Sequence, residues 1–243
     1  MKKPDPEGDL FKALEGKIAL DWQVPVVIRV DGRAFHTVTK KMKCEKPFDR
    51  AFHRSMICAA KSICGDAQNV RMAYIQSDEI SILLYEKNVE AQPWFGNRLQ
   101  KLVSISASIA TRAFDSDNGV PAYFDARAFN VPVELVQKYF YWRYKDARRN
   151  SISMLAQSMF PHKKLQNKGG REMIEMCSKA GVDYHNLDSW KRSGSLVVKH
   201  WAIQNLPDGS KCHRSSWVDK AAEFENEKAA DTFYQEMVER PVF

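Results

Sequence analysis

The sequence predicts an α+β fold in which a split βαβ unit, an antiparallel sheet with two helices on one face, is followed by a helical and hairpin C-terminal region. Three observations support this prediction. Four short segments are apolar or alternate apolar and polar residues, as strands do. Longer segments between them place apolar residues at helical spacing. The resulting order, β-α-β-β-α-β, is that of the split βαβ unit.

The residues before position 70 supply the first strand and helix. Residues 5–20 predict a short amphipathic helix with Leu10, Phe11, Leu14 and Ile18 at helical spacing. Residues 24–31 predict a strand. Alternation puts one set of its side chains on one face (Val26, Ile28, Val30) and a second set on the other (Val27, Arg29, Asp31). A polar loop then reaches Pro47, and a helix follows through about Cys64.

The rest of the unit is a hairpin, a helix and a last strand. Residues 70–75 and 80–85 predict two strands joined by a turn at 76–79. Residues 97–114 predict a helix, and residues 122–131 predict a strand closed by Pro132. Because both helices of a split βαβ unit cover one face, we expect the other face to be open for a substrate.

The C-terminal half reads as an extension of this unit. Residues 133–159 and 171–181 predict helices, and residues 195–205 and 211–218 predict a hairpin around Pro207–Gly209. Residues 219–238 predict a charged final helix. No Gly/Ser-rich linker separates the parts. We therefore interpret residues 1–131 as a palm-like part and residues 132–243 as an extension, packed together as one compact unit.

Composition narrows the classes of function. The chain of 243 residues carries 37 Lys and Arg against 30 Asp and Glu, and the formal net charge of +7 suits a polyanionic partner or simply a basic enzyme. Five cysteines without a CxxC pair argue against a disulfide framework or a zinc site and fit the cytoplasm. We expect no membrane association, because no apolar run is long enough to span a bilayer.

Acidic residues end two of the predicted strands. Asp31 ends the first strand, and Asp78 and Glu79 lie in the hairpin 47 residues later (78 − 31). The split βαβ topology makes these positions neighbours, so the two aspartates and the carbonyl of Gly32 could hold two Mg²⁺ ions about 3.5–4 Å apart. The alternative is ordinary turn chemistry, since Asp-Gly and Ser-Asp are common at strand ends.

Cations would have to bind phosphates in this protein, because the phosphate-binding patterns GxxxxGK[ST] and GxGxxG are absent. Arg33, Lys46, Arg98 and Lys101 are the candidates, and the last two share one helix face. Each of them could equally be a solvated surface charge. The patterns HExxH and GxSxG are absent as well, so zinc hydrolase and α/β-hydrolase chemistry have no support.

Basic and aromatic residues alternate between Lys138 and Asn150. Aromatic rings can stack on unpaired bases and arginines can bind phosphate, which indicates RNA contact. An amphipathic helix that buries Phe140, Tyr144 and Ala147 explains the same pattern, and both can hold on one helix. A later basic cluster between Lys199 and Arg214 has the same two interpretations, an RNA surface or a solvated hairpin.

Taken together, these motifs resemble the tRNA-histidine guanylyltransferase family, most closely its 3′–5′ polymerase branch, which repairs tRNA 5′ ends. The matching stretches are VDGRAFH (30–36), EKP (45–47), AYIQSDE (73–79), FDAR (124–127) and YWR (141–143), with weaker matches through residues 146–150 and 164–169. The resemblance implies a polymerase-like palm fold with a catalytic N-terminal part. It also implies a homotetramer made of two dimers.

The resemblance further implies roles for individual residues. Two Mg²⁺ ions would be held by Asp31, Asp78 and the Gly32 carbonyl, with Glu79 as a catalytic acidic neighbour. ATP and GTP would be substrates, and the positions around their triphosphates are the backbone amides of Arg33, Ala34, Phe35 and His36 with the side chains of Lys46, Ser77, Arg98 and Lys101. The expected tRNA contacts are Arg143, Arg148, Arg149, Asn150 and Lys168.

One departure from the family pattern bears on the substrate. Family members that serve tRNA-histidine carry HINNLYN where this chain has RRNSISM, so only Asn150 is retained. The loss of that histidine favours template-dependent repair of 5′-truncated tRNA, in which base pairing supplies specificity. A dedicated tRNA-histidine guanylyltransferase that adds a single G is the alternative. Further rivals are an inactive RNA-binding module and, on the same fold, a forward polymerase or a nucleotide cyclase.

Overall fold

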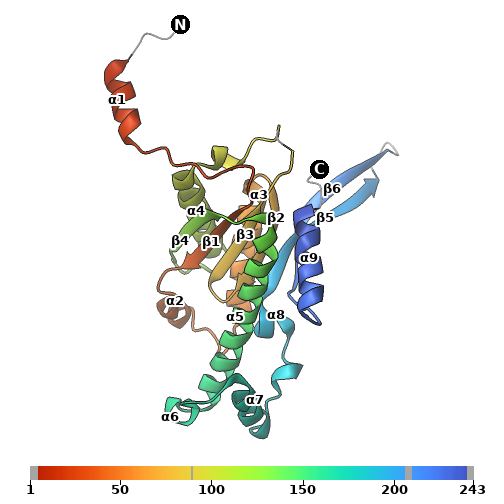
Figure 1. The fold of residues 1–243 in the computed structure, drawn as a ribbon. Helices are drawn as coiled ribbons and strands as arrows, with labels where there is room; N and C mark the ends of the chain where they lie inside the picture. Colours follow the sequence, from red (N-terminus) through yellow and green to blue (C-terminus); the bar gives the residue numbers. More distant parts are fainter. Residues whose placement is uncertain (1–4, 89, 206–209, 240–243) are drawn as a thin grey trace.

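A computed structural model describes residues 5–88, 90–205 and 210–239 and confirms the predicted α+β fold (Figure 1). Its centre is a six-stranded antiparallel sheet in the order β4-β1-β3-β2-β5-β6. The strands are β1 (Val26–Gly32), β2 (Val70–Gln76), β3 (Glu79–Leu84), β4 (Phe124–Asn130), β5 (Ser195–Asn205) and β6 (Lys211–Ala221). The helices are α1 (Pro6–Leu14), α2 (Phe35–Lys41), α3 (Arg50–Asp66), α4 (Leu99–Asn118), α5 (Val133–Met159), α6 (His162–Leu165), α7 (Gly170–Lys179), α8 (Ser189–Ser193) and α9 (Glu227–Glu239), with short 3-10 turns η1 (Trp94–Asn97) and η2 (Tyr184–Asn186).

Helices α3 and α4 cover one face of β4-β1-β3-β2, as the split βαβ order predicts. The strand alternation is confirmed, because Val26, Ile28 and Val30 lie in the core under these helices and Val27 lies in the core on the opposite face. Asp49 caps α3 by accepting a hydrogen bond from the Phe52 amide at 2.7 Å. Local sequence therefore sets where α3 begins and which of its sides packs on the sheet.

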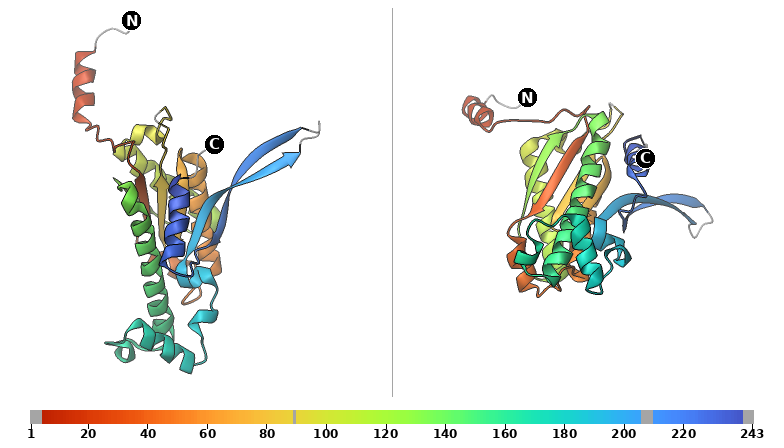
Figure 2. Two further views of the ribbon diagram at one scale, coloured as in Figure 1. Left: turned by 45° about the vertical axis from the view of Figure 1, so that its right-hand side comes forward. Right: turned by 60° about the horizontal axis from the view of Figure 1, so that its bottom comes forward.

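The second face of the sheet is not open, which corrects the expectation of a free substrate face. Helices α5 and α9 pack on it, and their buried residues Val136, Phe140 and Tyr234 share a core with Leu83. Figure 2 shows α5 lying along this face and α9 beside it. Phe140, Tyr144 and Ala147 of α5 are buried at helical spacing, whereas Trp142 is exposed, so the amphipathic interpretation of residues 138–150 holds.

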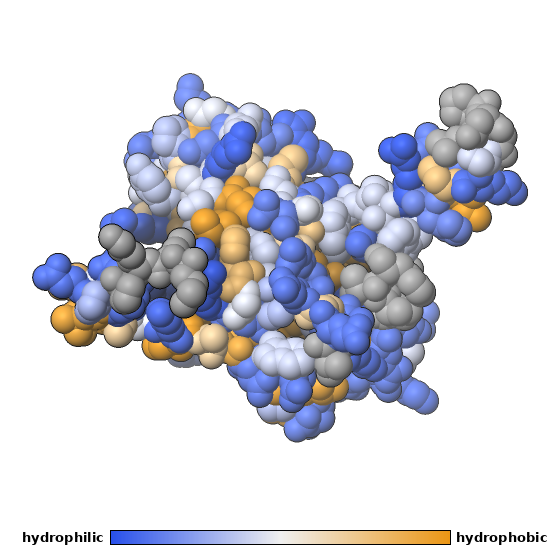
Figure 3. Space-filling view, turned by 90° about the horizontal axis from the view of Figure 1, so that it is seen from above, coloured by the Kyte–Doolittle hydropathy of each residue, from blue (hydrophilic) through white to orange (hydrophobic). Residues whose placement is uncertain are grey.

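Several element boundaries differ from the prediction. The polar loop before Pro47 contains α2, which begins after Ala34 in a left-handed conformation (φ 54°) and buries Phe35 and Val38. Helix α9 begins at Glu227, since β6 continues to Ala221. Helix α1 ends at Leu14 and buries none of its residues, and its apolar side chains form exposed surface at the left of Figure 3. The predicted hairpin turn at 207–209 lies outside the described residues.

The β5–β6 hairpin extends the sheet and then leaves it. Strand β5 pairs with β2 only from Ser195 to Val198, and beyond that point it pairs with β6 alone. The far half of the hairpin therefore projects from the body (Figure 2). Below the sheet, the end of α5 packs with α6 and α7 around a small third core that includes Leu155 and Tyr184. In the described part of the chain, no helix combines the length and apolarity needed to cross a bilayer.

Candidate active site

The structure brings Asp31, Asp78 and Glu79 to one end of the sheet. The Gly32 amide donates a hydrogen bond to the Asp78 carbonyl at 3.0 Å, which ties the end of β1 to the β2–β3 turn. In the ladders, Asp31 lies opposite Glu79 on one side and Asp125 on the other. Opposite residues in an antiparallel pair point to the same face, so an acidic row crosses three strands.

Local sequence makes this corner possible. A side chain at Gly32 would place its Cβ atom 2.4 Å from the Phe35 ring, so only glycine fits there. The Phe35 ring cannot retreat, because it is buried and packs against other buried rings, among them Phe114 and Phe124. Ser77 turns the hairpin in a left-handed conformation with φ 48°. The VDG and QSD motifs thus shape the backbone as well as supplying the acids.

Within the described residues, Asp31 and Asp78 have no ion pair with a protein cation, whereas Glu79 is paired with Arg143. Burial raises the pKa of Asp78, and the nearby charge of Asp31 acts in the same direction. Among the described residues, no lysine or arginine forms a salt bridge with either aspartate. Two carboxylates and the Gly32 carbonyl are hard oxygen donors of the kind that Mg²⁺ prefers, and Mg²⁺ commonly keeps water as its other ligands. The residues present therefore fit Mg²⁺, although no group of three or more acidic, histidine or cysteine side chains converges within the described ranges.

Glu79 is held differently from the two aspartates. Its Oε2 accepts a hydrogen bond from Arg143 at 2.9 Å, and its Oε1 accepts one from the Ser81 hydroxyl at 3.3 Å. Burial raises the pKa of Glu79, while the positive charges of Arg143 and Arg29 oppose that rise. Its carboxylate therefore links the acidic turn to α5, and a catalytic role for Glu79 stays a prediction.

Arg143, one of the predicted tRNA contacts, is buried in the folded chain. Its side chain is only 6% exposed and forms ion pairs with Glu79 at 2.9 Å and Asp146 at 3.3 Å. The sequence motif placed it among surface cations, but its position on α5 turns it toward the sheet.

The other expected tRNA contacts are scattered. Arg148 is half-buried against the Tyr144 ring, whereas Arg149 and Asn150 are exposed. Lys168 is exposed and pairs with Glu172 at 2.8 Å. Because Lys168 lies between α6 and α7, beside the third core, it is remote from the acidic corner.

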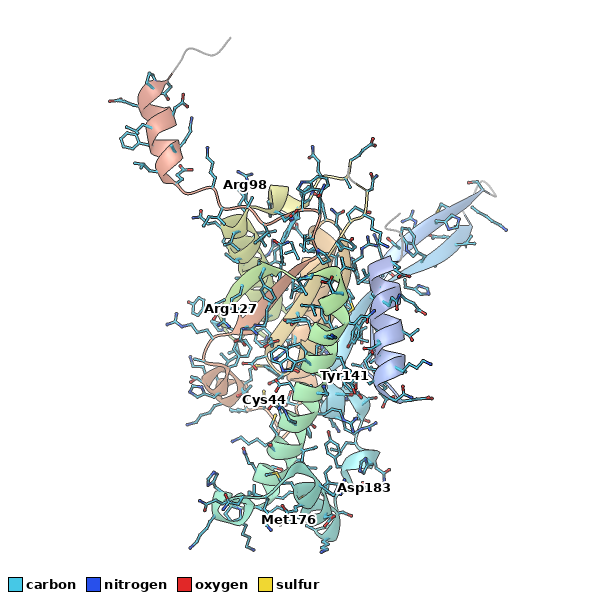
Figure 4. The ribbon with its side chains drawn as sticks, in the orientation of Figure 1. Cys44, Arg98, Arg127, Tyr141, Met176 and Asp183 are labelled. Carbon is cyan, nitrogen blue, oxygen red and sulfur yellow. The ribbon has the colours of Figure 1, made fainter. Side chains whose placement is uncertain are left out.

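The predicted phosphate contacts also separate. Lys46 and Arg33 are exposed near the acidic end, and the Arg33 amide is already donated to the Tyr123 carbonyl at 2.9 Å. Arg98 bridges to Ala19, before the start of β1, whereas Asp31 lies near the other end of that strand. Contacts of Arg98 and Lys101 with the triphosphates stay a prediction. Figure 4 shows Arg98 near the upper end of the molecule and Cys44, which follows α2, well below it.

A pocket that sequence reasoning missed opens beside the acidic turn. It is open to solvent, with about 570 Å³ of space between protein atoms and the solvent at its mouth, and it is lined by Gln76 at the end of β2, by Ser77 and by parts of α3, α5 and α8. His53 from α3 stacks on Trp190 from α8, with ring centroids 4.6 Å apart. Burial lowers the pKa of His53 to about 4, so this imidazole is neutral near pH 7, and its Nε2 lies 3.0 Å from the Ser195 hydroxyl. No sequence signal joins His53 to Trp190, because more than a hundred residues separate them.

Comparison with known proteins gives a family match, a curated relative and two related solved structures. Residues 8–132 match the sequence profile described as tRNAHis guanylyltransferase (Thg1). The tRNA(His) guanylyltransferase of Candida glabrata is 28% identical over 222 residues, which cover 82% of this chain and 92% of that protein. A bacterial tRNA(His) guanylyltransferase (Thg1)-like protein solved in complex with ATP is 34% identical, with a TM-score of 0.83 and coverage of 96% of this chain and 98% of that one. A structure of the same description in complex with GTP is 33% identical, with a TM-score of 0.81 and coverage of 97% and 100%.

Proposed function

This chain belongs to the tRNAHis guanylyltransferase family, a family of nucleotidyltransferases, and from that premise we propose that it adds nucleotides to the 5′ end of tRNA in the 3′–5′ direction by copying the opposite strand. The observation that carries the proposal is the pair of carboxylates, Asp31 and Asp78, which pair with no described cation and lie beside an open pocket. Such a corner suits transfer at phosphorus. An inactive RNA-binding module would have no use for these two carboxylates.

We propose that Asp31, Asp78 and the Gly32 carbonyl hold Mg²⁺. The bound ions would activate the attacking oxygen and neutralise the departing pyrophosphate. The protein's own task is to hold two like-charged carboxylates together at the end of the sheet, which the Gly32–Asp78 backbone hydrogen bond does. Burial of Asp78 keeps bulk water from competing for its oxygens.

The adjacent pocket is the proposed site of the activating ATP or GTP. A purine ring can stack on the His53–Trp190 pair, and the triphosphate would reach toward Ser77, Lys46 and the start of α2. The related bacterial proteins were solved with ATP and with GTP, which supports a purine nucleotide here.

The proposed reaction has two displacements at phosphorus. In the first, an oxygen of the tRNA 5′-monophosphate attacks the α-phosphorus of ATP or GTP, and pyrophosphate leaves. In the second, the 3′-hydroxyl of the incoming nucleotide attacks the tRNA 5′-phosphorus, its proton is lost, and AMP or GMP leaves. Both steps need the same charge neutralisation, so one acidic corner can serve both.

The tRNA surface is proposed from exposed cations. Arg149 is exposed on α5 next to Asn150, which lines the pocket, and the projecting hairpin adds Lys211 and Arg214, both exposed. The segment at 148–154 lacks the tRNA-histidine pattern, which supports template-dependent repair. Single-G addition is the second candidate, because the matching relatives bear the name tRNA(His) guanylyltransferase.

A panel of tRNAs tests the proposal. Wild-type protein is incubated with labelled nucleotides and 5′-truncated tRNAs that differ in the template base. We expect label at the 5′ end, with an added base that follows the template. Addition of G alone at one position would favour the single-G alternative, whereas label at the 3′ end, a cyclic product alone or no Mg²⁺-dependent incorporation would refute the proposal.

Asp31→Ala and Asp78→Ala test the metal assignment. Each removes a carboxylate, so we expect incorporation to be lost while the fold and tRNA binding persist. The matched control is Asp66→Ala, which removes an exposed carboxylate from the far end of α3 and should leave incorporation unchanged. Full activity in either active-corner variant would refute the assignment.

We also propose a cytoplasmic homotetramer made of two dimers. The exposed apolar side chains of α1 support self-association, since Phe11 is 64% exposed and Leu14 is 74% exposed. The free thiols support a reducing compartment. Light scattering should give four chains for the wild type and fewer for Phe11→Asp; a monomeric wild type would refute the assembly.

A further inference from the structure

We propose that Asp146 is a positioning residue that holds the pocket wall on α5 against the turn that carries Asp78, an inference that rests on the proposed nucleotide site. Asp146 lies on α5, two turns from the apolar residues that anchor the helix to the sheet, and its side chain is 19% exposed. No motif of the nucleotidyltransferase reaction assigns it a role.

Asp146 accepts hydrogen bonds from three side chains and forms an ion pair with a fourth. Its Oδ2 accepts hydrogen bonds from the amide nitrogens of Gln76 and Asn150 at 3.4 Å each, and its Oδ1 accepts one from Arg149. The ion pair joins Oδ2 to Arg143 at 3.3 Å. Gln76 comes from the end of β2, and the other three come from α5. One carboxylate therefore joins the catalytic turn to the helix that faces it.

The contact with Gln76 orients a residue of the pocket wall. A carboxylate only accepts hydrogen bonds, so Gln76 must turn its amide nitrogen toward Asp146 and its Oε1 away. That oxygen is buried and has no partner among the described residues, and Gln76 lines the pocket. Asp146 thus fixes the orientation of the Gln76 side chain in this part of the pocket wall.

The contact with Arg143 reaches the acidic corner. Arg143 pairs with Asp146 and with Glu79, and Glu79 is the first residue of β3, next to Asp78. Burial works to raise the pKa of Asp146, but the hydrogen bond from Arg149 and the charge of Arg143 bring it below its usual range, so the carboxylate is ionised near pH 7. An uncharged residue at this position would hold Arg143 and Gln76 less firmly.

The test measures affinity for a fluorescent ribose-labelled ATP without added divalent metal. We expect Asp146→Asn to weaken binding about tenfold, the loss of one charge-assisted contact, and Asp146→Glu to recover most of it. Glu172→Gln is the matched control, because it removes one carboxylate from an exposed ion pair with Lys168 and should leave affinity unchanged.

A double variant separates positioning from general stability. If Asp146 acts through the pocket wall, Asp146→Asn should have little further effect on affinity in a Gln76→Ala background. Equal ATP affinity in wild type and Asp146→Asn, or additive effects in the double variant, would overturn the positioning role alone. If wild-type protein does not bind the probe, the proposed nucleotide site fails, and the positioning role fails with it.

Discussion

Replacing Arg143 by methionine isolates a buried ion pair that the sequence does not reveal. Methionine keeps most of the aliphatic stem but removes the guanidinium, which leaves Glu79 and Asp146 without their shared cation. The Arg143 side chain is 6% exposed, against 15% for Glu79 and 19% for Asp146. Removing one partner of a buried pair costs about 3–5 kcal/mol, and we expect the lower end because Ser81 still donates to Glu79.

Arg149→Met is the matched control for this prediction. Arg149 pairs with the same Asp146 carboxylate, but its side chain is 71% exposed, so its loss should cost no more than about 1 kcal/mol. The free energy of unfolding is measured by urea titration at pH 7, followed by circular dichroism. Equal losses in the two variants would refute the reasoning. Unchanged stability with weakened tRNA binding in Arg143→Met would restore Arg143 as a surface contact.

Three further predictions follow from the site. The pKa of His53 falls to about 4 in the folded chain, below its usual 6.5, so the unfolded chain binds more protons between these values. The free energy of unfolding should therefore fall by up to about 3 kcal/mol as pH drops from 6.5 to 4. The difference in melting temperature between wild type and His53→Gln should shrink over that range. A constant difference would contradict this prediction. Gly32→Ala should lower the free energy of unfolding by about 1–3 kcal/mol, because the added Cβ meets the buried Phe35 ring at 2.4 Å; a neutral result in urea unfolding would show that the ring can move. Trp190→Ala should weaken binding of labelled ATP by about 1–3 kcal/mol through loss of stacking, with Trp142→Ala, an exposed tryptophan on α5, as the unaffected control; equal affinities would place the base elsewhere.

Local patterns were sufficient for much of the fold. Alternation in residues 24–31 and apolar runs at 70–75 and 80–85 predicted the strands, because side-chain direction along a strand depends only on sequence parity. Helix α5 was predicted with its bounds, since its apolar spacing continues to Met159. Helix α2 was missed because its seven residues include only two that are buried, too few for a helical pattern. The division of the chain after residue 131 stays a prediction, and β5 continues the sheet across it.

The sequence by itself determined that Asp31 and Asp78 end neighbouring strands, because the order of the elements leaves the split βαβ unit one arrangement for them. Tertiary structure alone decided which charges remain available at that corner. Arg143 and Arg149 belong to the same segment of alternating basic and aromatic residues, yet packing of α5 on the sheet buries Arg143 and leaves Arg149 exposed. Tertiary packing also places His53 against Trp190 and pairs Arg98 with Ala19, before the start of β1. Burial and long-range proximity depend on how elements pack against each other, and a one-dimensional pattern of residue types does not contain that information.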